Sequence, residues 1–161
     1  MKTYQKLLGA SCLALYLVGC GSGGGGESPV EISKNSEGKF QIRSKADNIT
    51  IQGVKLNRGN CVVNFVPIEE VAPLVVFLSS EITLISVQDF KDMASFCKDF
   101  NDKERLANIE NKISQLEQKG VMMEPQTLKF GESLKGISQG CDIIEAEIQT
   151  DKGAWTFNFN R

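Results

Sequence analysis

The segment 144–160 reads Ile-Glu-Ala-Glu-Ile-Gln-Thr-Asp-Lys-Gly-Ala-Trp-Thr-Phe-Asn-Phe-Asn and changes character at its centre. Apolar residues occupy alternate positions from Ile144 to Ile148, and again from Trp155 to Phe159. This period of two is typical of strands with one buried and one solvated face. Asp151-Lys152-Gly153 separates the two rows and supplies a glycine that tolerates positive φ. We therefore expect an antiparallel β-hairpin, with Trp155 in the core; a ligand platform at Trp155 is the alternative.

Similar alternation recurs in short pieces through the first part of the folded region. Gly53 interrupts one such piece and indicates a β-bulge. Residues 61–66 and 74–78 are denser apolar runs, typical of buried strands, and Pro67 and Pro73 bracket their connection. Residues 82–87 are expected to form a further strand. The alternating pairs are Val30/Ile32, Phe40/Ile42, Ile49/Ile51 and Val54/Leu56.

Two helical stripes lie between these strand regions, one from Phe90 to Phe100 and one from Leu106 to Leu116. Each places apolar residues at spacings of 3, 4 and 3, and the two stripes are out of register with each other. Asn101 with Glu104 matches a capping-box pattern. We expect a helix near 89–100, a break, and a helix near 102–119 closed by Gly120, with one bent helix as the alternative. The second stripe is expected to pack on the domain's own sheet; a coiled-coil seam is the alternative.

These elements together predict a mainly β protein of the α+β class. The expected architecture is an antiparallel β-sandwich or open barrel with a helical insertion near 89–119. Residues 30–161 are numerous enough to bury one hydrophobic core, so we expect them to form a single domain.

The composition excludes several kinds of chemistry. Of the 161 residues, 41% are hydrophobic and 24% are charged, which is ordinary for a folded protein, but none is histidine. This removes Ser-His and Cys-His catalysis, imidazole bases and His-ligated zinc or haem. The chain has 18 basic and 20 acidic residues and no basic patch, so nucleic acid is not an expected partner.

The first 20 residues form a pattern typical of exported proteins. Lys2 and Lys6 precede a run of 12 mostly apolar residues (7–18), which is too short to span a bilayer and has the length of a signal-peptide core. The run ends in Leu17-Val18-Gly19-Cys20, which closely resembles the lipobox of bacterial lipoproteins. The resemblance implies removal of residues 1–19 by cleavage between Gly19 and Cys20, and a diacylglyceryl group on the Cys20 thiol. An ordinary signal peptide with a chance cysteine is the alternative.

Residues 20–29 are the expected link between the lipid and the domain. The stretch 21–28 (Gly-Ser-Gly-Gly-Gly-Gly-Glu-Ser) is a flexible coil by composition, with an r.m.s. reach of about 15 Å. A glycine run directly after the lipidated cysteine resembles the anchors of surface-displayed lipoproteins in some Gram-negative pathogens. Gly21 in place of an aspartate implies sorting to the outer membrane, with the domain facing either periplasm or exterior. The expected membrane contact is made by acyl chains on Cys20.

We expect the five cysteines to differ in their chemistry: removal with the leader, lipidation or disulfide formation. Cys12 leaves with the leader and Cys20 carries lipid, so three remain in an oxidising compartment where one bridge is expected. Cys61 and Cys141 both open apolar segments, and their bridge would close a loop of about 80 residues, contributing roughly 4 kcal/mol in the loop-entropy model. A bridge involving Cys97, or no bridge, is the alternative. The three cysteines are 36 and 44 residues apart without a Cys-x-x-Cys pair, so no metal is expected.

Few side chains suggest catalysis. Glu69 and Glu70 lie near prolines and fit a solvated loop. Glu145 and Glu147 share one face of a predicted strand and could in principle act as acid and base, but the solvated face of the hairpin is the expected role. No phosphate-binding glycine loop or nucleophile elbow is recognisable. The sequence therefore predicts neither catalytic residues nor a cofactor.

The functional expectation is a lipid-anchored envelope lipoprotein that acts as a binding or accessory module through protein–protein contacts and is not an enzyme. One alternative is an inhibitor of a lysozyme-like or other hydrolytic enzyme, a role that small disulfide-containing β domains on lipid anchors do serve. Another alternative is a lipoprotein component of a secretion or conjugation apparatus, or an exclusion factor. The sequence does not name the protein partner.

Overall fold

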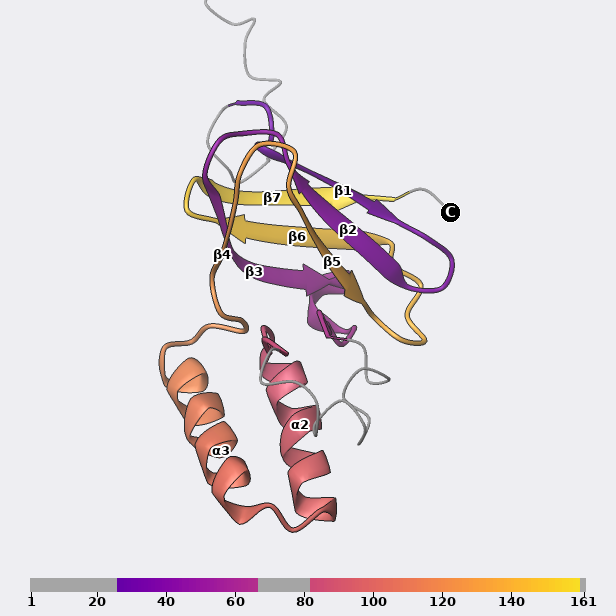
Figure 1. Cartoon of the computed structure of the whole chain (residues 1–161). Helices are drawn as coiled ribbons and strands as arrows, with labels where there is room; N and C mark the ends of the chain where they lie inside the picture. The colour runs from indigo at the N-terminus through magenta and orange to yellow at the C-terminus, as the bar shows by residue number, and fades with distance from the viewer. Residues whose placement is uncertain (1–25, 67–81, 160–161) are drawn as a thin grey trace, which may run out of the picture.

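The computed structural model describes residues 26–66 and 82–159, which form two β-sheets and a pair of helices (Figure 1). The expected leader 1–19, Cys20, most of the glycine-rich linker and the expected strand at 74–78 lie outside the described residues. The strands are β1 (Val30–Lys34), β2 (Lys39–Ser44), β3 (Ile49–Leu56), β4 (Gln126–Leu128), β5 (Ser133–Ile137), β6 (Glu145–Thr150) and β7 (Gly153–Asn158). The helices are η1 (Asn57–Gly59, a 3-10 turn), α2 (Val87–Asp99) and α3 (Lys103–Gln118).

The seven described strands form two antiparallel sheets, with strand orders β1-β2-β5 and β4-β3-β6-β7. The sheets stack face to face, with the strands of one crossing those of the other (Figure 1). Their inner faces enclose the main core, because alternate residues of each strand point inward. The fold is therefore α+β and mainly sheet, and of the two expected architectures it is the sandwich. The fully buried core side chains include Ile42, Ile49, Ile51, Leu56, Ala146 and Ile148.

The hairpin β6–β7 forms as the alternating pattern predicts. Residues 151–152 make the turn, and Ile148 lies opposite Trp155 on the inner face. Ile148 is fully buried, whereas Trp155 is only half-buried because β7 is the outermost strand of its sheet. Ile144 departs from the expected buried row: it precedes β6 and is 37% exposed. The buried row of β6 therefore begins at Ala146.

The predicted irregularity at Gly53 is confirmed. The pairing of β3 with β6 shifts register between Ile51 and Gly53, which is the signature of a bulge. A Cβ at Gly53 would lie 2.8 Å from the Gln149 Oε1 atom, so the glycine also allows a close approach of β6.

The two helices form an antiparallel pair at one end of the sandwich (Figure 1). The helical conformation is interrupted between them at Asn101, whose φ of 56° excludes a single bent helix. The expected cap at Asn101 is wrong by one residue: Asp102 accepts the hydrogen bond of the Arg105 backbone N–H. The helical stripes pack mainly on each other rather than on the sheet, forming a second core. Its buried members include Val87, Phe90, Met93, Cys97, Ile109 and Leu116.

Two expected strands are absent from the described part of the chain. Residues 61–66 make only single bridges, from Cys61 to Leu56 and from Asn64 to Ile137. Residues 82–85 are irregular, Ser86 makes a single bridge to Met123 and is the N-cap of helix α2, and the helix itself begins at Val87. The Asp89 carboxylate accepts the N–H groups of Phe65 and Val66 in the first segment and of Ile85 and Ser86 in the second, so these groups do not need a sheet partner. The sheets instead use β4 and β5, which are short or poor in apolar residues.

Candidate functional site

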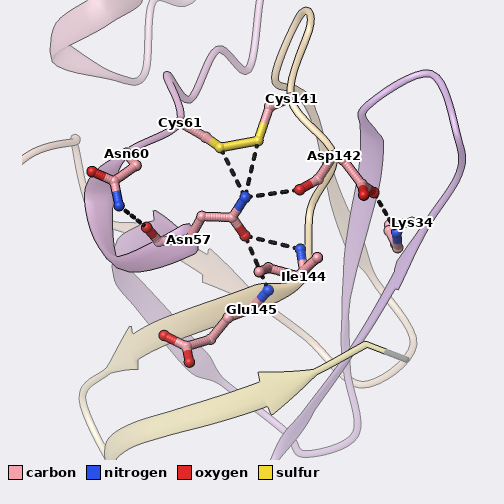
Figure 2. Close-up of a disulfide and its surroundings, with 8 residues drawn as sticks. All are labelled: Lys34, Asn57, Asn60, Cys61, Cys141, Asp142, Ile144 and Glu145. Carbon is pink, nitrogen blue, oxygen red and sulfur yellow. Dashed lines mark hydrogen bonds and ion pairs between the residues drawn. A yellow bond between two sulfur atoms is a disulfide. The ribbon is translucent and has the colours of Figure 1, made fainter. Parts of the chain in front are cut away.

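A disulfide joins Cys61 to Cys141, with a Cα–Cα distance of 6.0 Å across a sequence separation of 80. This is the pairing that the sequence favoured. It connects the loop after η1 to the segment that leads into β6, so it fixes the end of the sandwich nearest the helices (Figures 1 and 2). The bridge limits how far this loop can move, because it ties the loop covalently to the segment before β6.

Asn57 holds the same corner together through its side chain (Figure 2). Its Nδ2 donates to the Asp142 carbonyl at 2.8 Å and lies 3.2 and 3.4 Å from the two disulfide sulfur atoms. Its Oδ1 accepts the backbone N–H groups of Ile144 at 2.9 Å and Glu145 at 3.1 Å. Asn57 has a φ of 49°, a region that asparagine enters more readily than most residues.

Asp89 fastens the next part of the loop to helix α2. Its side chain is 1% exposed and accepts backbone N–H groups from Phe65 at 3.1 Å and Ser86 at 2.8 Å. Asn64 donates to it at 3.2 Å. Ser86 and Asp89 also form a capping box, and a carboxylate at a helix N-terminus is favoured by the helix dipole. The buried charge is therefore compensated by hydrogen-bond donors that face it.

The loop after η1, which the disulfide, Asn57 and Asp89 hold in place, forms one wall of a groove of about 410 Å³ between the sheet end and the helices. The loop after α3 forms the other side, because Met122 accepts a backbone hydrogen bond from Val87 at 2.9 Å. Val62 and Met122 line the groove and are 53% and 58% exposed. Exposed apolar side chains inside a concave site are a feature of binding surfaces.

Three basic side chains surround the apolar lining: Lys55, Arg58 and Lys91. The described lining residues include no carboxylate. Each cation has an acidic neighbour just outside the groove. The pairs are Lys55–Glu147 at 3.5 Å, Arg58–Glu145 at 3.3 Å and Lys91–Glu117 at 3.0 Å. Such exposed ion pairs contribute only about 0–1 kcal/mol each, so a bound acidic group can replace them at little cost.

Glu145 and Glu147 therefore lie on the solvated face of the hairpin, each beside its own cation. A hydrogen bond from Gln149, assisted by the charge of Lys55, lowers the pKa of Glu147 against the opposing effect of partial burial. A general acid at neutral pH needs a raised pKa instead. This geometry matches a solvated strand face better than an acid–base pair.

A second cavity, of about 610 Å³, lies on the three-stranded sheet and is lined by Lys34, Lys39 and Lys135 with the rings of Phe40 and Phe65. Lys34 already pairs with Asp142 at 3.3 Å, and Lys39 with Glu37 at 2.9 Å. None of the strongly exposed apolar residues in the described chain lines this cavity, whereas Val62 and Met122 line the groove. We therefore regard the smaller groove as the better candidate site.

Cys97 is a free thiol inside the helical core, 2% exposed. Burial, with the nearby charge of Asp102, raises its pKa. A buried thiol with a raised pKa has little thiolate and is a poor nucleophile. Within residues 26–66 and 82–159, no cluster of three potential metal-ligating side chains is found.

Several expected site residues lie outside the described residues: Gly19, Cys20, Glu69 and Glu70. Among the helices of the described ranges, none has both the length and the hydropathy to cross a membrane.

Sequence reasoning missed the groove. Its apolar members come from segments about 60 positions apart in the chain, Val62 and Met122, so no local pattern connects them. Two local signals were available: the capping pattern Ser86-x-x-Asp89, and the Asn57-Arg58-Gly59-Asn60 turn before Cys61.

Comparison with known proteins finds no matching family model, no matching curated protein and no matching solved structure.

Proposed function

We propose that this protein is a lipid-anchored lipoprotein of the bacterial cell envelope, and that its folded domain is a binding or accessory module acting through protein–protein contacts. The observation that carries the binding role is the groove with its exposed Val62 and Met122. The lipobox at 17–20 and the glycine-rich stretch after it support the anchor.

The anchor would be the acyl chains on Cys20. Each buried methylene contributes about 0.8 kcal/mol, so two or three chains hold a protein at a bilayer essentially permanently. Sorting to the outer membrane follows from Gly21 at the position after the lipidated cysteine. The flexible linker would let the domain reorient while staying within about 15 Å of the lipid surface.

The position of the groove relative to the tether supports this role. The described chain begins at the end of the sandwich that carries the loop between β4 and β5, and the helices lie at the other end (Figure 1). Lys45 fixes that beginning by donating its backbone N–H to Pro29 at 2.8 Å and by an ion pair with Glu27. The groove therefore lies at the end away from the tether, where a partner can reach it.

The chemistry of the groove favours a protein segment with an apolar anchor residue flanked by acidic side chains. The apolar residue would cover Val62 and Met122, and the acidic groups would face Lys55, Arg58 and Lys91. Charge complementarity of this kind steers association and fixes orientation.

Site-specific photo-cross-linking in intact cells tests the binding role. A photoreactive residue at position 62 or 122 is expected to cross-link the same partner. Phe130, which is 69% exposed in the loop at the tethered end, is the matched control position and is expected to give no such product. Arg58→Glu should weaken cross-linking from position 62 severalfold, because it reverses one charge at the groove. Equal labelling from all three positions, or none from any, would contradict the proposed binding site.

A further inference from the structure

The outermost strand of the four-stranded sheet, β7, carries backbone groups that face away from the sheet. Thr150 and Gly153 flank a two-residue turn, so residues 153, 155 and 157 direct their backbone groups toward β6. The Phe159 N–H continues this phase by donating to the Ile144 carbonyl at 2.9 Å. Ala154, Thr156 and Asn158 consequently direct their N–H and C=O groups outward.

The other sheet edges of the described chain are protected against pairing with a further strand. Strand β1 carries Glu31 and Lys34, and β4 has only 3 residues. The end of β5 is closed by Asn64, which exchanges backbone hydrogen bonds of 3.0 and 2.7 Å with Ile137. Charges, short length and coverage are the usual means by which edges avoid association.

Among residues 26–66 and 82–159, strand β7 has none of these protections. Its sequence, Gly-Ala-Trp-Thr-Phe-Asn over residues 153–158, has neither a charge nor a proline. Thr156 and Asn158 are exposed, and Trp155 and Phe157 are only half-buried. An uncharged six-residue edge next to incompletely buried aromatic rings is a template for strand addition.

We propose that two copies of this chain associate through antiparallel pairing of their β7 strands, which joins the two four-stranded sheets across a two-fold axis. A second copy fits because antiparallel pairing of identical edges is self-complementary, and uncharged edges bring no like charges together. With the axis at Thr156, all the outward residues pair: Thr156 with its own copy, and Ala154 with the partner's Asn158. Trp155 then lies opposite the partner's Phe157, and each ring covers the other.

Disulfide cross-linking of the purified full chain in detergent tests this pairing. Cα atoms of a hydrogen-bonded antiparallel pair lie about 5.5 Å apart, inside the range of about 4.4–6.8 Å that a disulfide spans. Under mild oxidation, most of the Thr156→Cys protein should run as a reducible homodimer. The matched control is Thr127→Cys, an exposed threonine on β4 at the opposite edge of the same sheet, which should stay monomeric.

A second variant separates loss of pairing from loss of folding. Thr156→Pro removes one outward N–H and no hydrogen bond to β6, so the fold should persist while the dimer is lost in sedimentation measurements. A monomeric wild type, equal cross-linking of the two cysteine variants, or a dimer that survives Thr156→Pro would each overturn the proposal. In intact cells, oxidation that cross-links Thr156→Cys only to a different protein would also overturn it, in favour of a foreign strand on this edge.

Discussion

At the scale of single residues, two side chains take the place of strand partners. Asn57 binds the backbone of residues 142–145, directly after the disulfide, and Asp89 binds the backbone of the loop at Phe65. Residues 61–66 are apolar enough for a strand, but these side chains meet the hydrogen-bonding needs of the segments that flank or form it. The sequence could not reveal this, because Asp89 acts on residues more than twenty positions away.

Substitution of Asn57 measures how much its side chain contributes to the free energy of unfolding. Asn57→Ala should lower the free energy of unfolding by about 2–3 kcal/mol. The change removes the side-chain hydrogen bonds, and alanine lacks the polar group that lets asparagine adopt a positive φ. Asn57→Gly, which relaxes the backbone, should cost less than Asn57→Ala. Asn60→Ala is the control: its side chain makes an exposed hydrogen bond to the Asn57 carbonyl, and the change should stay within about 0.5 kcal/mol. Urea titration gives these values, and equal effects at both positions would contradict the role of Asn57.

At the scale of elements, strong periodicity predicted structure well. The β6–β7 hairpin, the bulge at Gly53 and the two helices follow from periods of two and about 3.6 with local breakers. Strand β5 was missed because Ser-Leu-Lys-Gly-Ile has little alternation, and its pairing partner β2 lies about 90 positions away. The packing of α3 on α2 rather than on the sheet also depends on tertiary contacts that neither helical stripe specifies alone.

The β2–β5 pair depends on a glycine. A Cβ at Gly136 would lie 2.3 Å from the Cζ atom of Phe40, whose ring is 3% exposed and has little room to move. Gly136→Ala should therefore lower the melting temperature, with a cost of about 1–3 kcal/mol from overpacking. Gly53→Ala is the matched strand glycine: its nearest neighbour is the flexible end of the Gln149 side chain, so a smaller loss is expected. Calorimetry that found Gly136→Ala neutral would contradict this packing.

At the scale of the whole molecule, the sandwich, the disulfide and the helical pair produce a groove at one end. The fold class and the disulfide pairing could be predicted, because each leaves a local trace in periodicity or in cysteine position. The groove could not, because it exists only where the loop after η1 meets the loop after α3. The proposed anchor is a different case, since it rests on a short local motif, the lipobox-like residues 17–20, which lies outside the described residues.

The anchor is also the claim on which the envelope role depends, and its test is direct. Cells expressing the full chain are labelled with a fatty-acid analogue, and the mature N-terminal peptide is identified by mass spectrometry. The proposed function predicts a chain that begins at Cys20 with a diacylglyceryl group on its thiol, and predicts the same for Cys12→Ser, which alters the other cysteine of the leader region. An unmodified Cys20 thiol, or a mature chain that begins at another residue, would contradict the account.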